Sequence, residues 1–181
     1  MLFQNGKLVV RELENRDNHL LAKWLSDPRV LEFYEGRDNP FDLEKVNQTF
    51  YQRENGVVRC MVEFENVEIG YIQFYPVDDE ERELYGYDEV PDRIYGMDQF
   101  IGEPEYWNRG IGTALVSSMV EYLLEQKQAD RVVMDPQTWN ERAIKCYEKC
   151  GFTRVKLLPK RELHEGKYRD CWLIEYVKID R

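Results

Sequence analysis

The amino-acid sequence predicts a mixed α/β fold, with helices on both faces of a mostly antiparallel sheet of about seven strands. Three observations predict it. Segments with strand-like and helix-like periodicity alternate along the 181 residues. The strand-like segments are rich in β-branched and aromatic residues. Apolar residues make up 43% of the chain, which is enough for a buried core. We expect one domain over residues 1–181.

The first part of the chain is expected to form one strand and two helices. Residues 7–13 have the pattern of a strand, and Asp17 is the expected N-cap of a helix that ends before Pro28. A second helix is expected over residues 42–54, where apolar residues recur at helical spacing.

A β-hairpin and a central strand follow. Residues 57–77 are rich in strand-forming residues and are interrupted at residues 65–66, which predicts a hairpin. Residues 78–92 are expected to form an acidic loop before a strand at residues 94–101. The rest of the chain is expected to contain a loop and helix over 102–126, a short strand over 130–136, a helix over 140–151, and two strands over 152–163 and 167–178.

The charge of the chain limits its partners. The net charge is −10, from 35 acidic and 25 basic residues, which opposes nucleic-acid binding and favours a cationic partner or simple solubility. No leader and no long apolar run is apparent, so we expect a cytoplasmic protein with no membrane partner. The four cysteines have no metal-ligand spacing with His19 or His164, so we expect no metal and assign the thiols no chemistry.

The segment "WNRGIG" places Gly110 and Gly112 at the first turn of a helix, directly after a strand. The unpaired N–H groups and the positive end of a helix suit a phosphate or a pyrophosphate. Arg109 adds a positive charge, and the first acid of the helix is Glu121. The segment is neither a Walker loop nor a complete G-x-G-x-x-G motif, and tight packing is an alternative explanation of its glycines.

A second motif follows one strand later. In "NERAIKCYEKCGF", Asn140, Ala143 and Tyr147 share one helical face, and Gly151 lies where a left-handed C-terminal cap is expected. The two motifs in this order resemble the GNAT superfamily of N-acetyltransferases, over about residues 94–155. The family often has Gln or Arg where this chain has Trp107. Because the phosphate site uses backbone N–H groups, this difference casts little doubt on cofactor binding.

The resemblance implies acetyl-CoA as the co-substrate, with its pyrophosphate at residues 109–113 and its pantetheine arm along a strand backbone. It also implies that Tyr147 protonates the departing thiolate, which a phenol can do because it is not ionised at neutral pH. A core tyrosine on a helix face is the alternative. The cofactor-binding residues that follow are Phe100, Ile101, Arg109, Gly110, Ile111, Gly112, Thr113, Asn140 and Tyr147.

Asp98 is the candidate group for the acceptor amine. In "YGMDQFIG" it shares one strand face with Gly96 and Phe100, and the strand leads into the glycine loop. A carboxylate there could bind an ammonium group and accept its proton, either directly or through water. A buried structural Asp, bonded to the backbone or to Arg93, is the alternative.

A narrower resemblance concerns the acceptor. The segments "EIGYIQFY", "YGMDQFIG" and "MDPQTWNERAIKCYEKCGF" look like those of aminoglycoside 6'-N-acetyltransferases. This resemblance implies that acids hold a polycationic sugar, and Tyr71 and Gln73 could add contacts to its hydroxyl groups. The implied acids are Asp98, Asp88 or Glu89, and Asp135. The alternatives are a solvated charge run for the loop acids and a helix cap before Pro136 for Asp135.

We therefore expect an acetyl-CoA-dependent N-acetyltransferase that is a monomer or a homodimer. Its acceptor is expected to be a primary amine, in particular the 6'-amine of an aminoglycoside, which attacks the thioester directly in a ternary complex. One alternative is acylation of another amine, such as a siderophore side chain, a polyamine or a protein N-terminus. Another is a non-catalytic acyl-CoA-binding module, although the presence of Tyr147 and Asp98 argues against it.

Overall fold

The computed structural model of the protein describes residues 1–179. Over these residues the fold is mixed α/β, with six α-helices and an open, mostly antiparallel sheet of eight strands in the order β1-β2-β3-β4-β5-β6-β8-β7. The predicted fold class is confirmed, with one strand more than expected. The chain divides into two compact units: unit 1 contains residues 1–73, 99–112 and 163–167, and unit 2 contains the remaining described residues.

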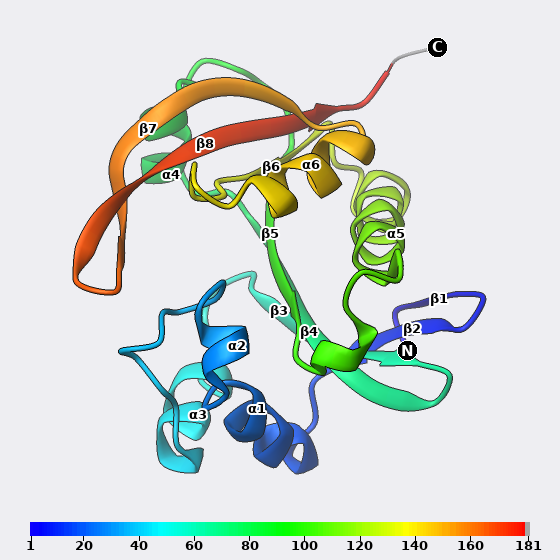
Figure 1. Ribbon diagram of the computed structural model, residues 1–181. Coiled ribbons are helices and arrows are strands. Elements are labelled where there is room, and N and C mark those ends of the chain that lie inside the picture. The colour runs from blue at the N-terminus through cyan, green and yellow to red at the C-terminus, as the bar shows by residue number, and fades with distance from the viewer. Residues whose placement is uncertain (180–181) are drawn as a thin grey trace. The chain divides into compact units, whose positions relative to one another are not determined.

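Figure 1 labels the elements along the chain. The strands are β1 (Phe3–Asn5), β2 (Leu8–Glu12), β3 (Val58–Phe64), β4 (Val67–Pro76), β5 (Ile94–Ile101), β6 (Arg131–Met134), β7 (Thr153–His164) and β8 (Lys167–Val177). The α-helices are α1 (Asn18–Trp24), α2 (Pro28–Leu31), α3 (Leu43–Phe50), α4 (Asp79–Tyr85), α5 (Ile111–Gln126) and α6 (Glu141–Lys149). Two 3-10 helices are η1 (Asn15–Asp17) and η2 (Pro104–Tyr106).

The strands of unit 1 pair antiparallel. β2 lies between β1 and β3, with Val10 opposite Val62. The predicted hairpin is confirmed: β3 and β4 are joined at Glu65 and Asn66, whose φ angles of 50° and 65° are those of a type I′ turn. β1 was not predicted, because its three residues have no strand pattern of their own.

The three α-helices of unit 1 lie beside one another (Figure 1) and pack around a core of aliphatic and aromatic side chains. α2 was not predicted, because Pro28 was interpreted as the end of a helix. It is the first residue of a new one, and the Asp27 side chain accepts a hydrogen bond from the Arg29 N–H as its cap. One buried core cluster of unit 1 consists of Leu21, Trp24, Leu25, Val30, Leu31, Phe41, Val46, Phe50, Met61, Tyr71 and Phe100.

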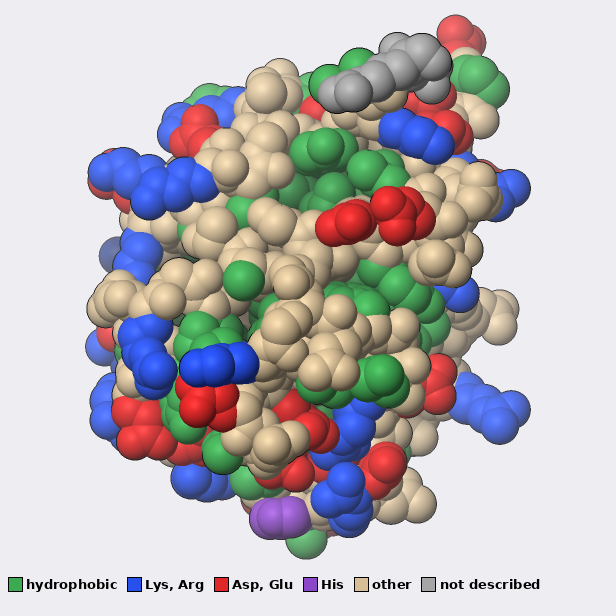
Figure 2. All heavy atoms as spheres, turned by 90° about the vertical axis from the view of Figure 1, so that its right-hand side faces the viewer, with side chains coloured by type: hydrophobic (Ala, Val, Ile, Leu, Met, Phe, Trp, Pro, Cys, Tyr) green, Lys and Arg blue, Asp and Glu red, His purple; other side chains and the backbone are tan. Residues whose placement is uncertain are grey.

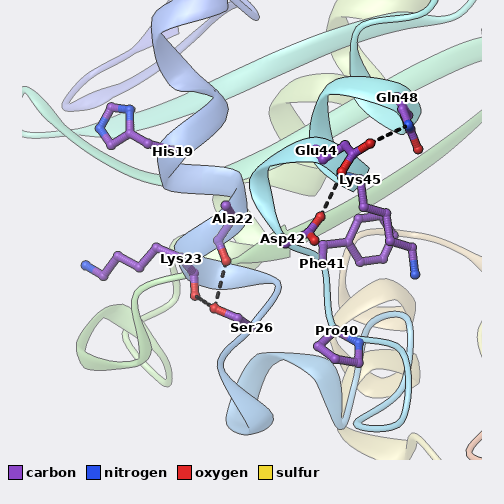
Figure 3. A pocket seen from close by; sticks show the side chains of 10 residues that line it. All are labelled: His19, Ala22, Lys23, Ser26, Pro40, Phe41, Asp42, Glu44, Lys45 and Gln48. Atoms are coloured by element: carbon purple, nitrogen blue, oxygen red, sulfur yellow. Dashed lines mark hydrogen bonds between the residues drawn. The ribbon is translucent and has the colours of Figure 1, made fainter.

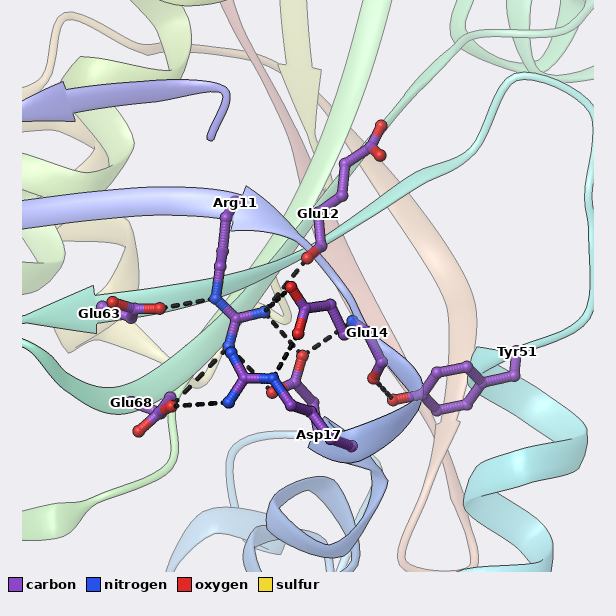
Figure 4. A network of polar contacts seen from close by, with 8 residues as sticks. Arg11, Glu12, Glu14, Asp17, Tyr51, Glu63 and Glu68 are labelled. Carbon is purple, nitrogen blue, oxygen red and sulfur yellow. Dashed lines mark hydrogen bonds and ion pairs between the residues drawn. The ribbon is translucent and has the colours of Figure 1, made fainter.

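Asp17 is the N-cap residue of α1, as predicted, but its side chain makes no capping hydrogen bond to that helix and forms a buried ion pair. Its carboxylate accepts hydrogen bonds from both terminal nitrogens of Arg11, at 2.8 and 2.9 Å, and from the Glu14 N–H at 2.8 Å. The Arg11 Nε donates to Glu63 at 2.6 Å (Figure 4). The Asp17 side chain faces β2 because the Arg11 guanidinium attracts it more strongly than the amides of α1.

The strands of unit 2 include a parallel pair. β5 runs parallel to β6, with Gly96 opposite Val133, and β6 runs antiparallel to β8. Parallel neighbours need a crossover connection, and the segment from η2 to the end of α5 supplies it. The buried core cluster of unit 2 consists of Val77, Tyr85, Tyr87, Ile94, Val133, Leu158, Cys171 and Leu173.

The segment at residues 78–92 is not the acidic loop that the sequence predicted. Residues 79–85 form α4, which the Asp78 side chain caps by accepting a hydrogen bond from the Glu81 N–H. The helix ends at Gly86, whose φ of 85° is left-handed. Acids near a helix N-terminus stabilise it by interaction with the helix dipole, so the charge run that indicated a loop favours a helix here.

Figure 2 shows charged side chains of both signs interspersed over one face of the protein. Exposed ion pairs also occur at the surface of unit 1. Lys7 lies 3.3 Å from Glu65, and both side chains are more than half exposed. Pairs of this kind contribute little to stability, because water screens them.

Candidate active site

Strand β5 holds Asp98 at a partly open position. Gly96 and Phe100, on the same face of the strand, are buried, whereas Asp98 is half-buried. Arg93, the partner considered for a purely structural Asp98, directs its guanidinium to the Lys127 carbonyl at 3.4 Å. The Arg93 guanidinium thus has a partner other than Asp98.

Tyr75, at the end of β4, lies against the same part of β5. A Cβ atom built on Gly96 would lie 2.6 Å from Cε2 of the Tyr75 ring. Burial raises the pKa of the Tyr75 phenol, and the charges of Asp98 and Asp135 raise it further. Two of the acids predicted to hold the acceptor therefore act on one tyrosine, which the sequence analysis did not name. Alternation along β4 could have indicated it, because Tyr71, Gln73 and Tyr75 share one face.

Asp135 follows β6 and is already paired with a cation. Its Oδ2 accepts a hydrogen bond from the Arg161 Nε at 3.1 Å, and Arg161 also donates to Glu81 at 2.8 Å. Burial raises the pKa of Asp135, and the positive charge of Arg161 opposes that rise. The helix-cap alternative for Asp135 was wrong, since α6 begins at residue 141 with Asn140 as its N-cap. No local pattern indicates Arg161, which reaches Asp135 from β7.

Of the acids in the segment at residues 78–92, Glu81 reaches this cluster. Its carboxylate lies on α4, is 35% exposed and accepts from Arg161. Asp88 and Glu89, the predicted substrate acids, are exposed in the turn that follows α4. Formation of α4 decides this difference, because it turns Glu81 toward Arg161.

Tyr71 and Gln73 belong to unit 1. Tyr71 is fully buried among aromatic side chains and its hydroxyl donates to the Gln73 Oε1 at 2.6 Å. Its ring packs on Phe50 and Phe100, with ring centroids 5.1 and 5.6 Å apart. Tyr71 is thus a core residue, and Gln73, half-buried, is the more open of the two predicted contacts.

The glycine loop leaves open space around its backbone. Gly110 has a φ of 77°, which favours glycine, and it directly precedes α5. A Cβ atom on Gly110 or Gly112 would meet no atom within 4 Å. The alternative that these glycines allow tight packing is therefore wrong. The first turn of α5 contains no acid, so its N–H groups are available to an anion.

Side chains next to the loop are held by the protein. Arg109 is exposed and lies over the Tyr106 ring, 5.0 Å from the centroid, while Ile111 is buried. In unit 2, the Thr113 hydroxyl lies 3.4 Å from the Cys146 sulfur of α6. Ile111 and Thr113 thus anchor the helix start.

Trp107, the departure from the family pattern, has a structural role in unit 1. Its indole N–H donates to the Ile101 carbonyl at 2.8 Å. This bond attaches the loop to the end of β5, the strand predicted to lie along the pantetheine arm. The Phe100 ring is buried against Tyr34 and Trp24, so only the backbone of this residue could serve a ligand.

Helix α6 carries the second motif. The Asn140 side chain caps it by accepting from the Ala143 N–H at 3.4 Å, and Gly151 ends it with a φ of 100°. The C-terminal cap prediction is therefore confirmed. Tyr147 is half-buried, and its ring packs edge-on against Phe152 with centroids 6.4 Å apart.

Three of the four cysteines are poor nucleophiles. Burial raises the pKa of Cys60 and that of Cys171 to about 12, and it also raises the pKa of Cys150. Thiols with such values remain protonated at neutral pH. Within residues 1–179, no group of three or more His, Cys, Asp or Glu side chains could hold a metal ion. None of the helices in this range has the length and apolar character needed to cross a membrane.

Unit 1 also contains an open groove of about 960 Å³ between α1 and α3 (Figure 3). Its charged side chains have partners within the unit: Lys23 lies 2.9 Å from Glu103, and the Lys45 ammonium lies over the Phe41 ring. None of the predicted site residues lines it. We assign it no role.

Comparison with known proteins identifies the class of this fold and site. The profile of the acetyltransferase (GNAT) domain matches residues 14–159. The protein is therefore an acetyltransferase. Because the match spans most of the sequence, the chain belongs to the GNAT family, as the resemblance of its motifs indicated.

Relatives of this chain include enzymes that modify amines. It is 28% identical to aminoglycoside N(6')-acetyltransferase type 1 of Klebsiella pneumoniae over 153 residues. The aligned region covers 83% of this chain and 76% of the relative. Its fold is similar to that of AAC(6')-Ib in complex with ribostamycin and coenzyme A, with a TM-score of 0.77, 23% identity, and coverage of 96% of this chain and 94% of that one. It is also similar to spermidine N-acetyltransferase from Vibrio cholerae in complex with CoA and spermine, with a TM-score of 0.77, 18% identity, and 96% of each chain covered. The two structural likenesses show the shared fold.

Proposed function

We propose that this protein transfers an acetyl group from acetyl-CoA to the 6'-amine of an aminoglycoside. The observation that carries the acceptor assignment is the identity with the Klebsiella aminoglycoside N(6')-acetyltransferase over most of the chain. The carboxylates near Tyr75 support it, because an aminoglycoside carries several ammonium groups. We further propose that the chain acts as a single cytoplasmic domain, as a monomer or homodimer, without a metal or nucleic acid.

The residues of the glycine loop fit the phosphates of acetyl-CoA. Gly110 and Gly112 leave room for a ligand to approach the backbone, and the start of α5 offers N–H groups without a competing acid. Arg109 adds an exposed positive charge, which lies over the Phe64 and Tyr106 rings. We assign the backbone of Phe100 and Ile101 to the pantetheine arm, while Asn140 supports the site indirectly by capping α6.

Asp98 and Tyr147 are the proposed catalytic residues. When bound, acetyl-CoA supplies the acetyl group as a thioester. Asp98 accepts a proton from the acceptor ammonium and so provides the neutral amine that attack requires. Tyr147 donates its hydroxyl proton to the departing sulfur as the C–N bond forms and the C–S bond breaks. The proton lost by the nitrogen restores Tyr147 by way of solvent, and Asp98 releases its own proton to water. Direct attack agrees with the raised pKa values of Cys60, Cys150 and Cys171, which disfavour a thiolate that could carry an acetyl group.

A second candidate acceptor is a polyamine. The fold is similar to that of a spermidine N-acetyltransferase, and a polyamine presents the same chemistry of several ammonium groups to the acids near Tyr75. The aminoglycoside has stronger support, because its relative shares more sequence with this chain.

A matched pair of acceptors tests the proposal. Neomycin and paromomycin differ at the 6' position, which carries an amine in the first and a hydroxyl in the second. We expect free thiol to be released from acetyl-CoA with neomycin and much more slowly with paromomycin. Equal rates with the two antibiotics would contradict 6'-acetylation, and turnover with spermidine alone would favour the polyamine.

Variants of Asp98 test its role in the same assay. Asp98→Asn should leave the KM for acetyl-CoA nearly unchanged and should lower kcat by about 100-fold or more, because the proton acceptor is lost. Asp79→Asn is the matched control, since Asp79 is an exposed acid in the first turn of α4. An unchanged kcat in Asp98→Asn would remove Asp98 from the mechanism.

A further inference from the structure

The Tyr75 ring lies on Gly96 at a distance that no other residue at position 96 would allow. A Cβ atom there would lie 2.6, 2.7 and 2.8 Å from the Cε2, Cζ and hydroxyl oxygen of Tyr75. Such distances are shorter than van der Waals contact. The absence of a side chain at Gly96 is therefore what lets the tyrosine hydroxyl reach the surface of β5.

The Tyr75 hydroxyl is within reach of Asp98. Gly96 and Asp98 are two residues apart on the same face of β5, which separates their Cα atoms by about 6.6 Å. A side chain can span such a gap. Burial and the negative charges of Asp98 and Asp135 raise the pKa of the same hydroxyl. It therefore stays protonated over the physiological pH range.

This hydroxyl also differs from those of its neighbours in unit 2. Tyr85 makes hydrogen bonds with Arg161 and Asp135, and Tyr87 donates to Glu175 at 2.6 Å. Among the described residues, none makes a hydrogen bond with the Tyr75 hydroxyl. Half-buried tyrosine hydroxyls normally have a partner, and a ligand that enters beside Asp98 would supply one.

We propose that Tyr75 is an acceptor-binding residue, whose hydroxyl oxygen accepts an N–H from the substrate ammonium that Asp98 holds. An ammonium group has three N–H donors, so two protein oxygens can bind it together and restrict its rotation. Asp98 then takes the proton from a nitrogen that is already oriented. This inference rests on the proposed function in one respect, namely that the acceptor amine is held at Asp98.

Steady-state kinetics of Tyr75→Phe test the proposal. The change removes only the hydroxyl. The KM for neomycin should rise about tenfold, which corresponds to about 1.4 kcal/mol of lost binding. The KM for acetyl-CoA and the melting temperature should stay unchanged, because the ring still packs on Gly96. An unchanged KM for neomycin, or a rise in the two KM values together with a lower melting temperature, would overturn the proposal.

Tyr95→Phe is the matched control. Tyr95 is also a half-buried tyrosine, but it lies on the opposite face of β5 from Gly96 and Asp98. Its variant should keep the wild-type KM for neomycin. A rise equal to that of Tyr75→Phe would show a general effect on the strand and would contradict a specific role.

Gly96→Ala provides an independent variant, because it keeps the hydroxyl but forces the ring away from the strand. It should also raise the KM for neomycin, and adding Tyr75→Phe should cause little further change. Full additivity would contradict the inference. The choice of acceptor separates the two proposals. If the wild-type enzyme acetylates spermidine and no aminoglycoside, the aminoglycoside assignment is wrong. The same variants then test the role of Tyr75 with spermidine as the acceptor.

Discussion

Replacement of Arg11 by Met should destabilise unit 1 strongly, because it leaves a buried carboxylate without its cation. Asp17 is 1% exposed, and two of its three hydrogen bonds come from Arg11, as Figure 4 shows. The methionine side chain is uncharged and replaces the aliphatic stem of arginine, so the change removes these bonds and keeps the apolar packing of the stem.

The expected loss follows from this geometry. Removing one partner of a buried ion pair typically costs about 3 to 5 kcal/mol, because the remaining charge has lost the interaction that offset its desolvation. Asp17 keeps only the hydrogen bond from the Glu14 N–H. Glu63, Glu14 and Glu68, the further acidic partners of Arg11, are 20%, 52% and 30% exposed and regain water, so they add little. We therefore expect a decrease of about 3 kcal/mol in the free energy of unfolding.

Urea unfolding at neutral pH measures this quantity. Arg16→Met is the control, because Arg16 pairs with Glu14 at the surface, and its variant should unfold like the wild type. The double variant Arg11→Met/Asp17→Asn should lose less stability than the sum of the two single variants, since the uncompensated charge is absent. A loss below about 1 kcal/mol for Arg11→Met, the size of an ordinary neutral hydrogen bond, would refute the reasoning.

The effect should also depend on pH. Burial alone raises the pKa of Asp17, but the hydrogen bonds from Arg11 and Glu14 outweigh it and hold the pKa below 3.8. A depressed pKa stabilises the fold above the unfolded value of about 3.9 and loses this contribution as the pH falls below it. Without Arg11, burial raises the pKa of Asp17, which can then protonate. The difference between wild type and Arg11→Met should therefore be largest near neutral pH and shrink toward pH 3.

Three further predictions concern single side chains. Gly112→Ala should raise the free energy of unfolding by up to about 1 kcal/mol, since alanine favours helices, and it should increase the KM for acetyl-CoA severalfold. An unchanged KM for acetyl-CoA would contradict the phosphate site. Gly102→Ala should lower the free energy of unfolding by about 2 kcal/mol in a urea titration, because its Cβ atom would lie 2.2 Å from the buried Trp24 indole. Wild-type stability would show that the indole can move. Tyr147→Phe should lower kcat by about 100-fold at an unchanged melting temperature, since the ring still packs on Phe152; an unchanged kcat would exclude Tyr147 as the acid.

Elements with strong local patterns were predicted well from the sequence. The hairpin at residues 57–77 and the central strand at residues 94–101 have period-2 alternation, which is a property of the strand itself. The glycine loop before α5 and the left-handed Gly151 after α6 depend on backbone conformations that few other residues adopt. These features arise within a few residues of chain, so neighbours in sequence are sufficient to specify them.

Contacts between distant segments were not predicted. Arg161 reaches Asp135 and Glu81 from β7, and the three residues are far apart in sequence. The Asp17 side chain, at the N-cap position of α1, binds Arg11 because a guanidinium charge is a stronger partner than a backbone amide. Tyr75 lies beside Asp98 only because β4 and β5 are neighbours in the sheet.

By itself, therefore, the sequence determined the fold class, the glycine loop and the GNAT family, because periodicity, glycine conformation and motif order are local properties of the chain. The tertiary structure alone decided which charges face which. In the packed chain, Arg161 pairs with Asp135 and Glu81. Tyr71 is buried, and the Tyr75 hydroxyl lies on Gly96. The physical reason is that electrostatic partners and burial depend on distance in space, which only the packed chain defines.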